Sequence, residues 1–291
     1  MAVPCTAAVA EDVAALLAQR VPAASAGSEI RDGEVVFWIP VEQAEAVLGA
    51  VRAETARMRD AGVPVQPEQV VARPALPEQE WRDAWKRYFH TVRLTRQILV
   101  VPSWEERPLP AADDLIIDLD PGQAFGTGAH ASTRLVLEAE QALRDEGAAV
   151  ARFLDVGTGS AILAIAAARL WPDSAGLAID VDPLAVDVAA ENCAINRVGA
   201  RIQVAATPLA AVEGQFDLVL ANIQADVLAL LRADLIGRLA PGGALILSGL
   251  LAEQAPEVAR EFAAAAGIEL VAVLPSADDP EWSAVRLRRR P

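Results

Sequence analysis

The chain has 291 residues, of which 53% are hydrophobic and 22% charged, so it can bury a substantial core and is not intrinsically disordered. Its formal net charge of −15 argues against direct nucleic-acid binding, which usually needs a basic surface, but is compatible with a basic protein partner. Two cysteines cannot build a disulfide framework, and no Cys/His pair has metal-ligand spacing, so we expect no metal and a reducing compartment.

The N-terminal segment has no basic region, and Glu11 and Asp12 interrupt its apolar stretch, so we expect no signal peptide. No apolar run approaches the ~20 residues that span a membrane. These features predict a cytoplasmic protein that does not bind a membrane.

The first 75 residues alternate helical and strand patterns, without a glycine loop or a cluster of ligand-like side chains. We predict helices over residues 6–20 and 42–59, a strand over 34–39, and a further short strand within 63–71. The segment 1–75 is therefore predicted to be a small α+β domain.

Residues 76–112 are predicted to be an interdomain helix and linker. The helix carries Trp81, Trp85 and Phe89 at four-residue spacing, a pattern more typical of packing than of substrate contact. A short strand over 97–101 and a proline-rich stretch follow.

From residue 113 to residue 291 the pattern changes to repeated strand-and-helix units. Strands are predicted over residues 115–119, 153–156, 176–180, 201–205, 216–221 and 244–247, and helices over 132–145, 160–170, 183–196, 226–239 and 254–266. The last two strands, 268–274 and 282–287, are predicted to pair as an antiparallel hairpin. The fold class is therefore α/β, with a doubly wound, mostly parallel sheet.

The segment 153–167 has the pattern of a buried strand, a two-glycine turn and an apolar helix. Gly157 and Gly159 have no Cβ and let the backbone approach a ligand closely. Ser160 is predicted to cap the helix, whose first N–H groups would then point toward the same ligand. Asp180 ends the next strand, near the ~20-residue spacing at which a carboxylate meets a ribose in nucleotide-binding units.

Ala161 and Ile162 stand where a dinucleotide-binding loop would have its third glycine. A nucleoside with a small charged group at its other end is therefore favoured over a dinucleotide. The alternative for this segment alone is a tight turn that binds nothing. However, Gly157, Asp180 and Asn222 all fall at the carboxyl ends of predicted strands, where ligands bind in such sheets, and packing explains this coincidence poorly.

Residues 120–133, which we call the signature run, closely resemble the motif D-P-G-x-A-F-G-T-G-x-H-x-[ST]-T of the bacterial PrmA family. The resemblance continues through residues 155–163, 179–183, 220–223 and 241–249, and upstream through 80–85 and 102–104. It covers the chain from about residue 78 to the end, whereas the first 75 residues match only in size and element pattern.

Members of the PrmA family use S-adenosylmethionine to methylate amino groups of ribosomal protein L11. The resemblance implies a ferredoxin-like recognition domain followed by a Rossmann-like class I methyltransferase domain. Carried over by motif, Thr133, Gly157, Asp180 and Asn222 would contact S-adenosylmethionine. Asn222 would also orient the acceptor amine, and no general base is assigned. Thr133 has the alternative role of a helix N-cap.

Other residues of the resembling segments have more than one interpretation. By analogy with the family, residues 125–127 would cover the cofactor, and His130 is expected to shape the loop rather than to act as a base. Ala161 departs from the family's third glycine. Gln224 and Asp226 also depart from the family pattern, and Asp226 would either favour a cationic amine or simply begin the next helix.

Three rival functions stay open at this point. A methyltransferase of the same fold could act on another protein or on a small amine, and would keep every cofactor residue. A nicotinamide-dependent oxidoreductase is disfavoured by the missing third glycine. A non-catalytic binding module is disfavoured because Gly157, Asp180 and Asn222 are all present.

Overall fold

The structure is a computed structural model. It describes residues 1–6, 9–21, 29–31, 33–37, 39, 43–73, 90–120 and 130–291. The chain forms two compact units, Met1–Trp85 and Lys86–Pro291, and each is described by itself. The predicted aromatic helix and residues 121–129 of the signature run, with the expected covering segment 125–127, lie outside the described residues. Within the described ranges, no helix combines the length and the apolar character needed to cross a bilayer.

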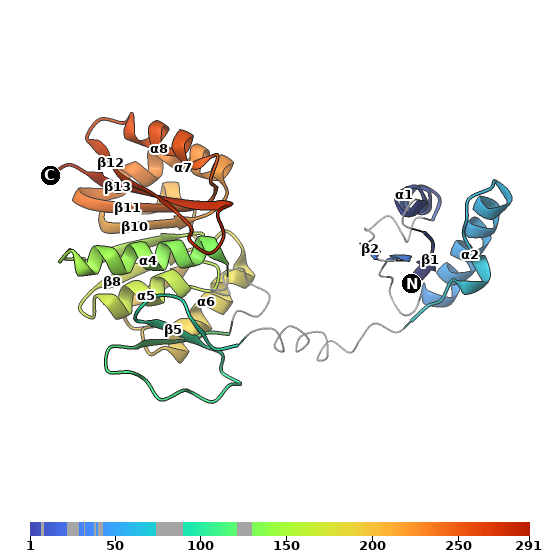
Figure 1. Ribbon diagram of the computed structural model, residues 1–291, viewed down its shortest axis with the longest axis horizontal. Helices are drawn as coiled ribbons and strands as arrows, with labels where there is room; N and C mark the ends of the chain where they lie inside the picture. The colour runs from blue at the N-terminus through green and yellow to red at the C-terminus, as the bar shows by residue number, and fades with distance from the viewer. Residues whose placement is uncertain are drawn as a thin grey trace. The chain divides into compact units, whose positions relative to one another are not determined.

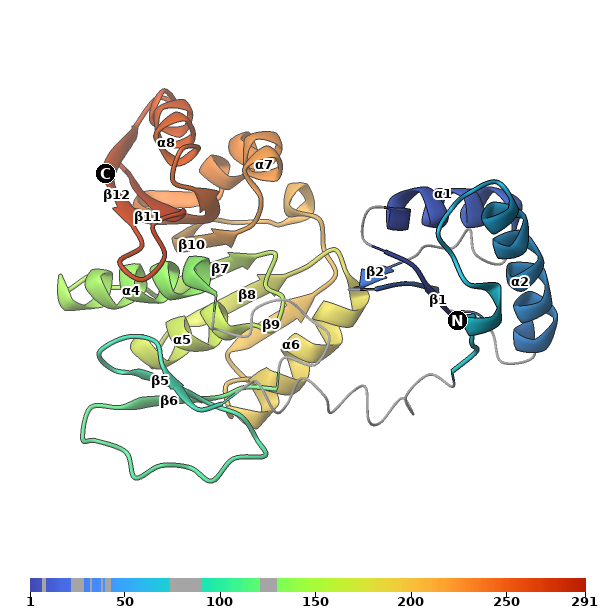
Figure 2. The same ribbon diagram turned by 45° about the vertical axis from the view of Figure 1, so that its right-hand side comes forward.

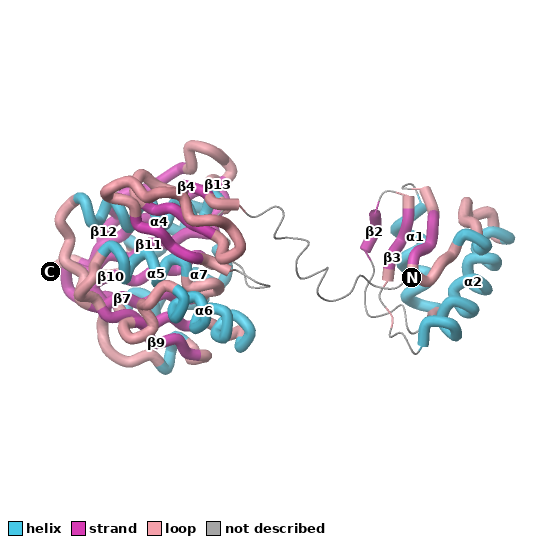
Figure 3. The backbone as a smooth tube through the Cα atoms, turned by 90° about the horizontal axis from the view of Figure 1, so that it is seen from below, coloured by secondary structure: helices cyan, strands magenta, loops and turns pink. Residues whose placement is uncertain are grey.

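Among its described residues, the first unit packs two helices and a short helical turn with a three-stranded antiparallel sheet of strand order β1-β3-β2 (Figure 3). Its elements are β1 (Ala2–Pro4), α1 (Ala10–Arg20), β2 (Glu29–Arg31), β3 (Glu34–Val36), α2 (Ala44–Asp60) and the 3₁₀ turn η4 (Pro67–Gln69). Its core includes Val13, Leu17, Val35, Phe37 and Val51, all 0–1% exposed. The ferredoxin-like topology stays a prediction.

Two features of this unit differ from the sequence predictions. The three-residue strands β1 and β2 are too short to show a period-2 pattern, and neither was predicted. Residues 63–71 contain no regular strand: Val65 and Val71 make single bridges to Cys5 and Ala2, with η4 between them. The cause is proline, which has no N–H to donate to a ladder.

The second unit begins with a small sheet of strand order β4-β5-β6. Its strands are β4 (Val92–Arg93), β5 (Ile98–Val101) and β6 (Leu115–Asp118). The sequence pattern suggested that the strand at 115–119 begins the large sheet. Instead, β6 pairs in parallel with β5 and belongs to this small sheet. The proline-rich stretch that we expected in a linker connects β5 to β6 within this unit.

The large sheet has seven strands in the order β12-β13-β11-β10-β7-β8-β9. They are β7 (Arg152–Val156), β8 (Ala175–Ile179), β9 (Ile202–Ala205), β10 (Phe216–Asn222), β11 (Leu239–Leu251), β12 (Ile268–Pro275) and β13 (Trp282–Arg289). The strands from β11 to β9 pair in parallel, and β13 pairs antiparallel with both β11 and β12. The predicted mostly parallel sheet with a C-terminal antiparallel hairpin is confirmed.

Helices cover both faces of this sheet, with α4, α5 and α6 on one side and α7 and α8 on the other (Figures 1 and 2). They are α4 (Ala131–Asp145), α5 (Ile162–Leu170), α6 (Pro183–Ile195), α7 (Ala225–Gly237) and α8 (Ala255–Ala263), with a 3₁₀ turn η6 (Leu209–Ala211). β7 and α5 are buried almost throughout, which explains why their sequences are mostly apolar; Asp155 is a buried polar exception in β7.

The strand β11 is longer than the predicted strand over 244–247. The predicted turn at Pro241–Gly243 lies inside it as an irregularity, because the register with β10 jumps from Leu239 to Ala244. Gly242 there has a φ of +79°, which glycine adopts without strain.

Candidate functional site

Three successive loops meet at the carboxyl end of the large sheet, where β7, β8 and β10 lie side by side. The N–H groups of Gly157 and Thr158 both donate to the carbonyl of Ile179, at 2.9 and 3.0 Å. The N–H of Gly159 donates to Asp180 Oδ2 at 2.9 Å. The glycine turn, residues 157–161, is therefore tied both to the end of β8 and to the carboxylate that follows it.

The backbone of the glycine turn is left-handed at Gly157, Gly159 and Ala161, with φ of +71°, +54° and +64°. Ala161 is the N-cap of α5, so the prediction that Ser160 caps this helix is wrong. Ser160 is instead fully buried within the turn. Left-handed backbone is costly for alanine, so the third turn position that is often glycine is occupied here by a strained residue.

Gly157 is required by contacts inside the protein. A Cβ at this position would lie 2.5 Å from Cγ2 of Ile223, in the loop after β10. A Cβ at Gly249, in β11, would lie 2.6 Å from the carbonyl oxygen of Ile223. Gly157 therefore lets the loop after β10 sit close to the glycine turn, and Gly249 lets β11 sit close to the same loop. The role of Gly249 was not predicted from the sequence.

The hydrogen bonds recorded for the Asp180 carboxylate all come from backbone N–H groups. Its Oδ2 accepts from Gly159, and its Oδ1 accepts from the N–H of Asp182 at 3.0 Å. The side chain is half-buried, and each oxygen keeps a lone pair for a further donor. A fixed carboxylate of this kind can accept from both hydroxyls of a vicinal diol.

Thr133 and Asn222, which lie 89 positions apart, meet at this end of the sheet. The Nδ2 of Asn222 donates to Thr133 Oγ1 at 3.3 Å. The Oδ1 of Asn222 is buried and has no hydrogen-bond partner. A buried acceptor without a donor is unfavourable, so this oxygen calls for an N–H or O–H from a ligand.

His130, rather than Thr133, is the N-cap of α4. Its Nδ1 accepts from the N–H of Ser132 at 3.2 Å and lies 2.8 Å from the Ser132 hydroxyl. Its ring packs edge-on against Trp282, with centroids 4.4 Å apart. These contacts agree with the expected loop-shaping role, and they place Thr133 in the first turn of the helix.

Two carboxyl groups lie in the core beneath the glycine turn. Asp155 Oδ2 accepts from the Thr158 hydroxyl at 2.7 Å, while its Oδ1 and both oxygens of Glu140 have no partner. Burial raises the pKa of Asp155 to about 6. Burial, together with the nearby Asp155, raises the pKa of Glu140 well above its usual value. The only sequence signal for Glu140 is a glutamate among the apolar positions of α4.

Two asparagines near this region were not predicted from the sequence: Asn192, in α6, and Asn196, the C-cap of that helix. Asn192 and Asn196 are both 1% exposed. Each side chain pairs with the backbone of a residue more than 70 positions away, Asp120 and Asp118 respectively. Their signal was two asparagines spaced four residues apart, in line with the buried Ala185 and Ala189.

The residues that depart from the family pattern have plain structural roles. Gln224 is the N-cap of α7, and Asp226 lies in the first turn of that helix. Asp226 is exposed, and its Oδ1 accepts from the N–H of Val227 at 2.9 Å. This geometry agrees with the interpretation that Asp226 begins a helix.

The arrangement fits a nucleoside that carries a charged group. Asp180 offers a carboxylate and Asn222 offers an unfilled acceptor, while Gly157 lets the glycine turn pack directly against Ile223. No group of three or more His, Cys, Asp or Glu side chains in the described ranges could hold a metal ion.

A family model matches nearly the whole chain, and known proteins resemble the larger part of it. The family model for PrmA, ribosomal protein L11 methyltransferase, matches residues 3–290. The ribosomal protein L11 methyltransferase of Geobacter sulfurreducens is 44% identical over 213 residues, which are 73% of this chain and 67% of that protein. The enzyme of the same name from Geobacter metallireducens is 49% identical over 179 residues, 62% of this chain and 57% of that protein.

The crystal structure of a ribosomal protein L11 methylase from Lactobacillus delbrueckii subsp. bulgaricus has the same fold. It is 33% identical to this chain, and the match has a TM-score of 0.62 over 70% of this chain and 100% of that one. The family model, the relatives and this structure agree with the resemblance found in the signature run. The chain belongs to the PrmA family of ribosomal protein L11 methyltransferases.

Proposed function

We propose that this protein transfers methyl groups from S-adenosylmethionine to amino groups of ribosomal protein L11. The observation that carries the proposal is the match to the PrmA family model over residues 3–290. The site geometry supports it, because the four residues that the motif assigns to the cofactor lie at one end of one sheet. The net charge of −15 also suits a basic protein substrate.

Each of the four residues has a distinct part in holding S-adenosylmethionine. Asp180 accepts from the ribose hydroxyls, with its carboxylate fixed by Gly159 and Asp182. Gly157 admits the methionine portion beside the glycine turn. Thr133 and Asn222, joined by their hydrogen bond, bound the site at the end of β10.

S-adenosylmethionine supplies a sulfonium methyl group, which an uncharged amine can displace without a strongly acidic or nucleophilic protein group. The protein therefore contributes position. The buried Oδ1 of Asn222 accepts an N–H of the acceptor amine and so directs its lone pair. An α-amine, with a pKa of ~7.7–8.0, loses its proton readily, whereas lysine, at ~10.4, relies on desolvation of its ammonium group in the site.

We assign recognition of the protein substrate to residues 1–75, in the first compact unit, and cofactor binding and methyl transfer to residues 113–291, in the second. Of the segment 76–112, predicted to be an interdomain helix and linker, β4 and β5 belong to the second unit. Removing residues 1–75 should leave the affinity for S-adenosylmethionine intact and abolish methylation of ribosomal protein L11. Full activity of the shortened chain would refute this assignment. We place the reaction in the cytoplasm and without direct nucleic-acid contact.

The test of the function is intact-mass spectrometry of purified ribosomal protein L11 after incubation with this protein and S-adenosylmethionine. Stepwise gains of one methyl mass are expected, and fragmentation locates the modified amines. If the mass is unchanged while calorimetry shows cofactor binding, the substrate is another protein or a small amine, or the site binds without turnover. If only a nicotinamide cofactor binds, the oxidoreductase alternative is correct.

A further inference from the structure

The side-chain amide of Asn192 lies between two segments that are far apart in the sequence. Its Oδ1 accepts from the N–H of Asp120 at 3.1 Å, and its Nδ2 donates to the carbonyl of Asp120 at 3.3 Å. The same Nδ2 donates to the carbonyl of Ser160 at 3.0 Å. The acceptor and donor roles fix the amide orientation, because a reversed amide would face N–H with N–H and oxygen with oxygen.

Both partners of Asn192 belong to segments that carry the cofactor assignment. Asp120 is the first residue of the signature run, and its carboxylate also accepts from the N–H of Ser103 at 2.9 Å. Ser160 is inside the glycine turn, directly after Gly159, whose N–H holds Asp180. A single buried side chain therefore joins the start of the signature run to the glycine turn, which positions the carboxylate of Asp180 that is assigned to the ribose.

We propose that Asn192 is a positioning residue for the cofactor site, which holds Asp120 and the glycine turn in one fixed arrangement. The inference rests on the proposed binding of S-adenosylmethionine. Two segments that are already aligned lose less conformational entropy when a ligand binds between them, so the contact raises affinity without touching the ligand. Asn192 itself is 1% exposed and lies on the buried face of α6.

The neighbouring asparagine provides a matched control. Asn196 is equally buried, one turn along the same chain segment, and accepts from the N–H of Asp118 at 3.0 Å. Its Nδ2 donates to the carbonyls of Asp118 and Asn192, at 2.6 and 2.8 Å. Each asparagine therefore makes three hydrogen bonds to backbone, but only Asn192 reaches the glycine turn.

The experiment compares Asn192→Ala and Asn196→Ala in the full chain. S-adenosylmethionine affinity is measured by isothermal titration calorimetry, and thermal stability by differential scanning calorimetry. We expect both variants to lose stability, since each loses three side-chain hydrogen bonds to backbone groups. Only Asn192→Ala should weaken cofactor binding, by about tenfold or more, whereas Asn196→Ala should stay within about threefold of the wild type.

Equal affinity losses in the two variants, or no loss in either, would overturn the positioning role of Asn192. If Asn192→Ala does not fold, Asn192→Ser takes its place in the same comparison, because serine keeps a donor and an acceptor of shorter reach. Failure of the wild type to bind S-adenosylmethionine would instead refute the proposed function, so the two failures are distinguishable.

Discussion

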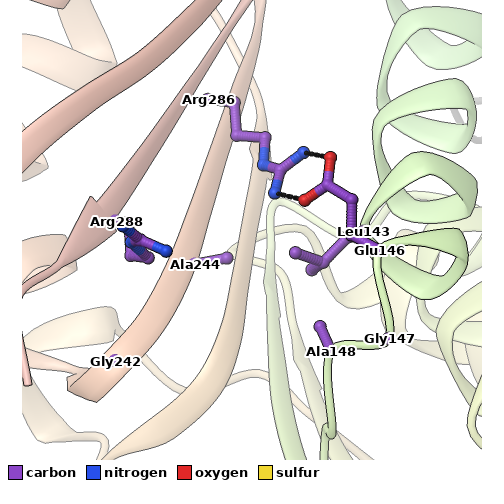
Figure 4. A pocket seen from close by; sticks show the side chains of 8 residues that line it. All are labelled: Leu143, Glu146, Gly147, Ala148, Gly242, Ala244, Arg286 and Arg288. Atoms are coloured by element: carbon purple, nitrogen blue, oxygen red, sulfur yellow. Dashed lines mark hydrogen bonds and ion pairs between the residues drawn. The ribbon is translucent and has the colours of Figure 1, made fainter.

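The two ends of the seven-stranded sheet use their polar side chains differently. At the carboxyl end, Asn222 Oδ1 is buried without a partner, and backbone N–H groups alone hold Asp180 among its recorded contacts. At the amino end, both terminal nitrogens of Arg286 donate to the carboxylate of Glu146 beside a small pocket (Figure 4). Arg288, which also lines that pocket, donates to Glu269 at 2.6 Å.

The difference between the two ends of the sheet indicates where a ligand is needed. The two arginines that line this pocket already have carboxylate partners within the chain, so a further anion would have to displace one of them. At the carboxyl end, the unfilled acceptor of Asn222 and the carboxylate of Asp180, for which only N–H donors are recorded, gain by binding donors from outside. Substitutions at the two ends should therefore separate loss of binding from loss of stability.

The largest effect is expected for Asp180→Ala. The variant loses the charged acceptor of two ribose hydroxyls and also frees the N–H of Gly159, so the affinity for S-adenosylmethionine should fall about 100-fold. Isothermal titration calorimetry measures this change. The affinity of Asp180→Asn, which keeps one oxygen acceptor, should lie between those of Asp180→Ala and the wild type. Unchanged affinity in Asp180→Ala would remove Asp180 from the cofactor site.

The next effect concerns stability beneath the same end of the sheet. Glu140→Leu removes a fully buried carboxyl without hydrogen-bond partners, so it should raise the free energy of unfolding by about 1–3 kcal/mol near pH 8. Glu140→Gln is a control of the same size that leaves buried polar atoms unpaired. Its free energy of unfolding should therefore rise less than that of Glu140→Leu. Urea unfolding at several pH values measures both.

The pH dependence of Glu140→Leu has a definite sign. Folding raises the pKa values of Glu140 and Asp155, so the folded wild type retains protons that the unfolded chain releases. The stability that these two groups contribute is fully present below their pKa values in the unfolded chain, which are near 4. It is lost as the pH rises through about 6 and above. The advantage of the leucine variant should therefore grow from pH 5 to pH 8. If the extra stability of Glu140→Leu shrinks over this range, folding does not raise the pKa values of Glu140 and Asp155.

The sequence predicted the large sheet well because its signals are local. Continuous apolar runs such as Leu218–Ala221, in strands that alternate with helices, specify a parallel sheet without knowledge of distant contacts. Gly157, Asp180 and Asn222 were found because strand ends can be read directly from such runs. The structure places these positions at the same end of the sheet.

What the sequence did not predict depends on contacts between distant segments. Asn192 and Asn196 act on residues more than 70 positions earlier, and Glu140 lies near Asp155 only after α4 packs. The strand β6 pairs with β5 rather than entering the large sheet, and no local pattern distinguishes these two outcomes. The cap of α5 was misplaced because Ala161 adopts a backbone conformation that alanine rarely has.

This misplaced cap leads to a smaller prediction. Ala161→Gly relieves left-handed strain, so it should be better tolerated than Ala164→Gly in the same helix by about 1–2 kcal/mol. Both residues are fully buried and lose the same methyl group, so packing largely cancels in the comparison. Chemical unfolding of the two variants measures the difference. Equal costs would mean that the turn at Ala161 carries no strain.

The smallest effect is expected at the amino end, for Glu146→Gln. The Glu146 side chain is 55% exposed, so losing its ion pair with Arg286 should cost less than about 1 kcal/mol of unfolding free energy, and less still at high salt. Arg286 lowers the pKa of Glu146, so this contribution exists above pH ~4.3 and is lost as the pH falls further. S-adenosylmethionine affinity should be unchanged, because the substitution lies at the opposite end of the sheet from Asp180. A loss of affinity comparable to that of Asp180→Ala would mean that the two ends are coupled through the sheet and that the contrast between them is false.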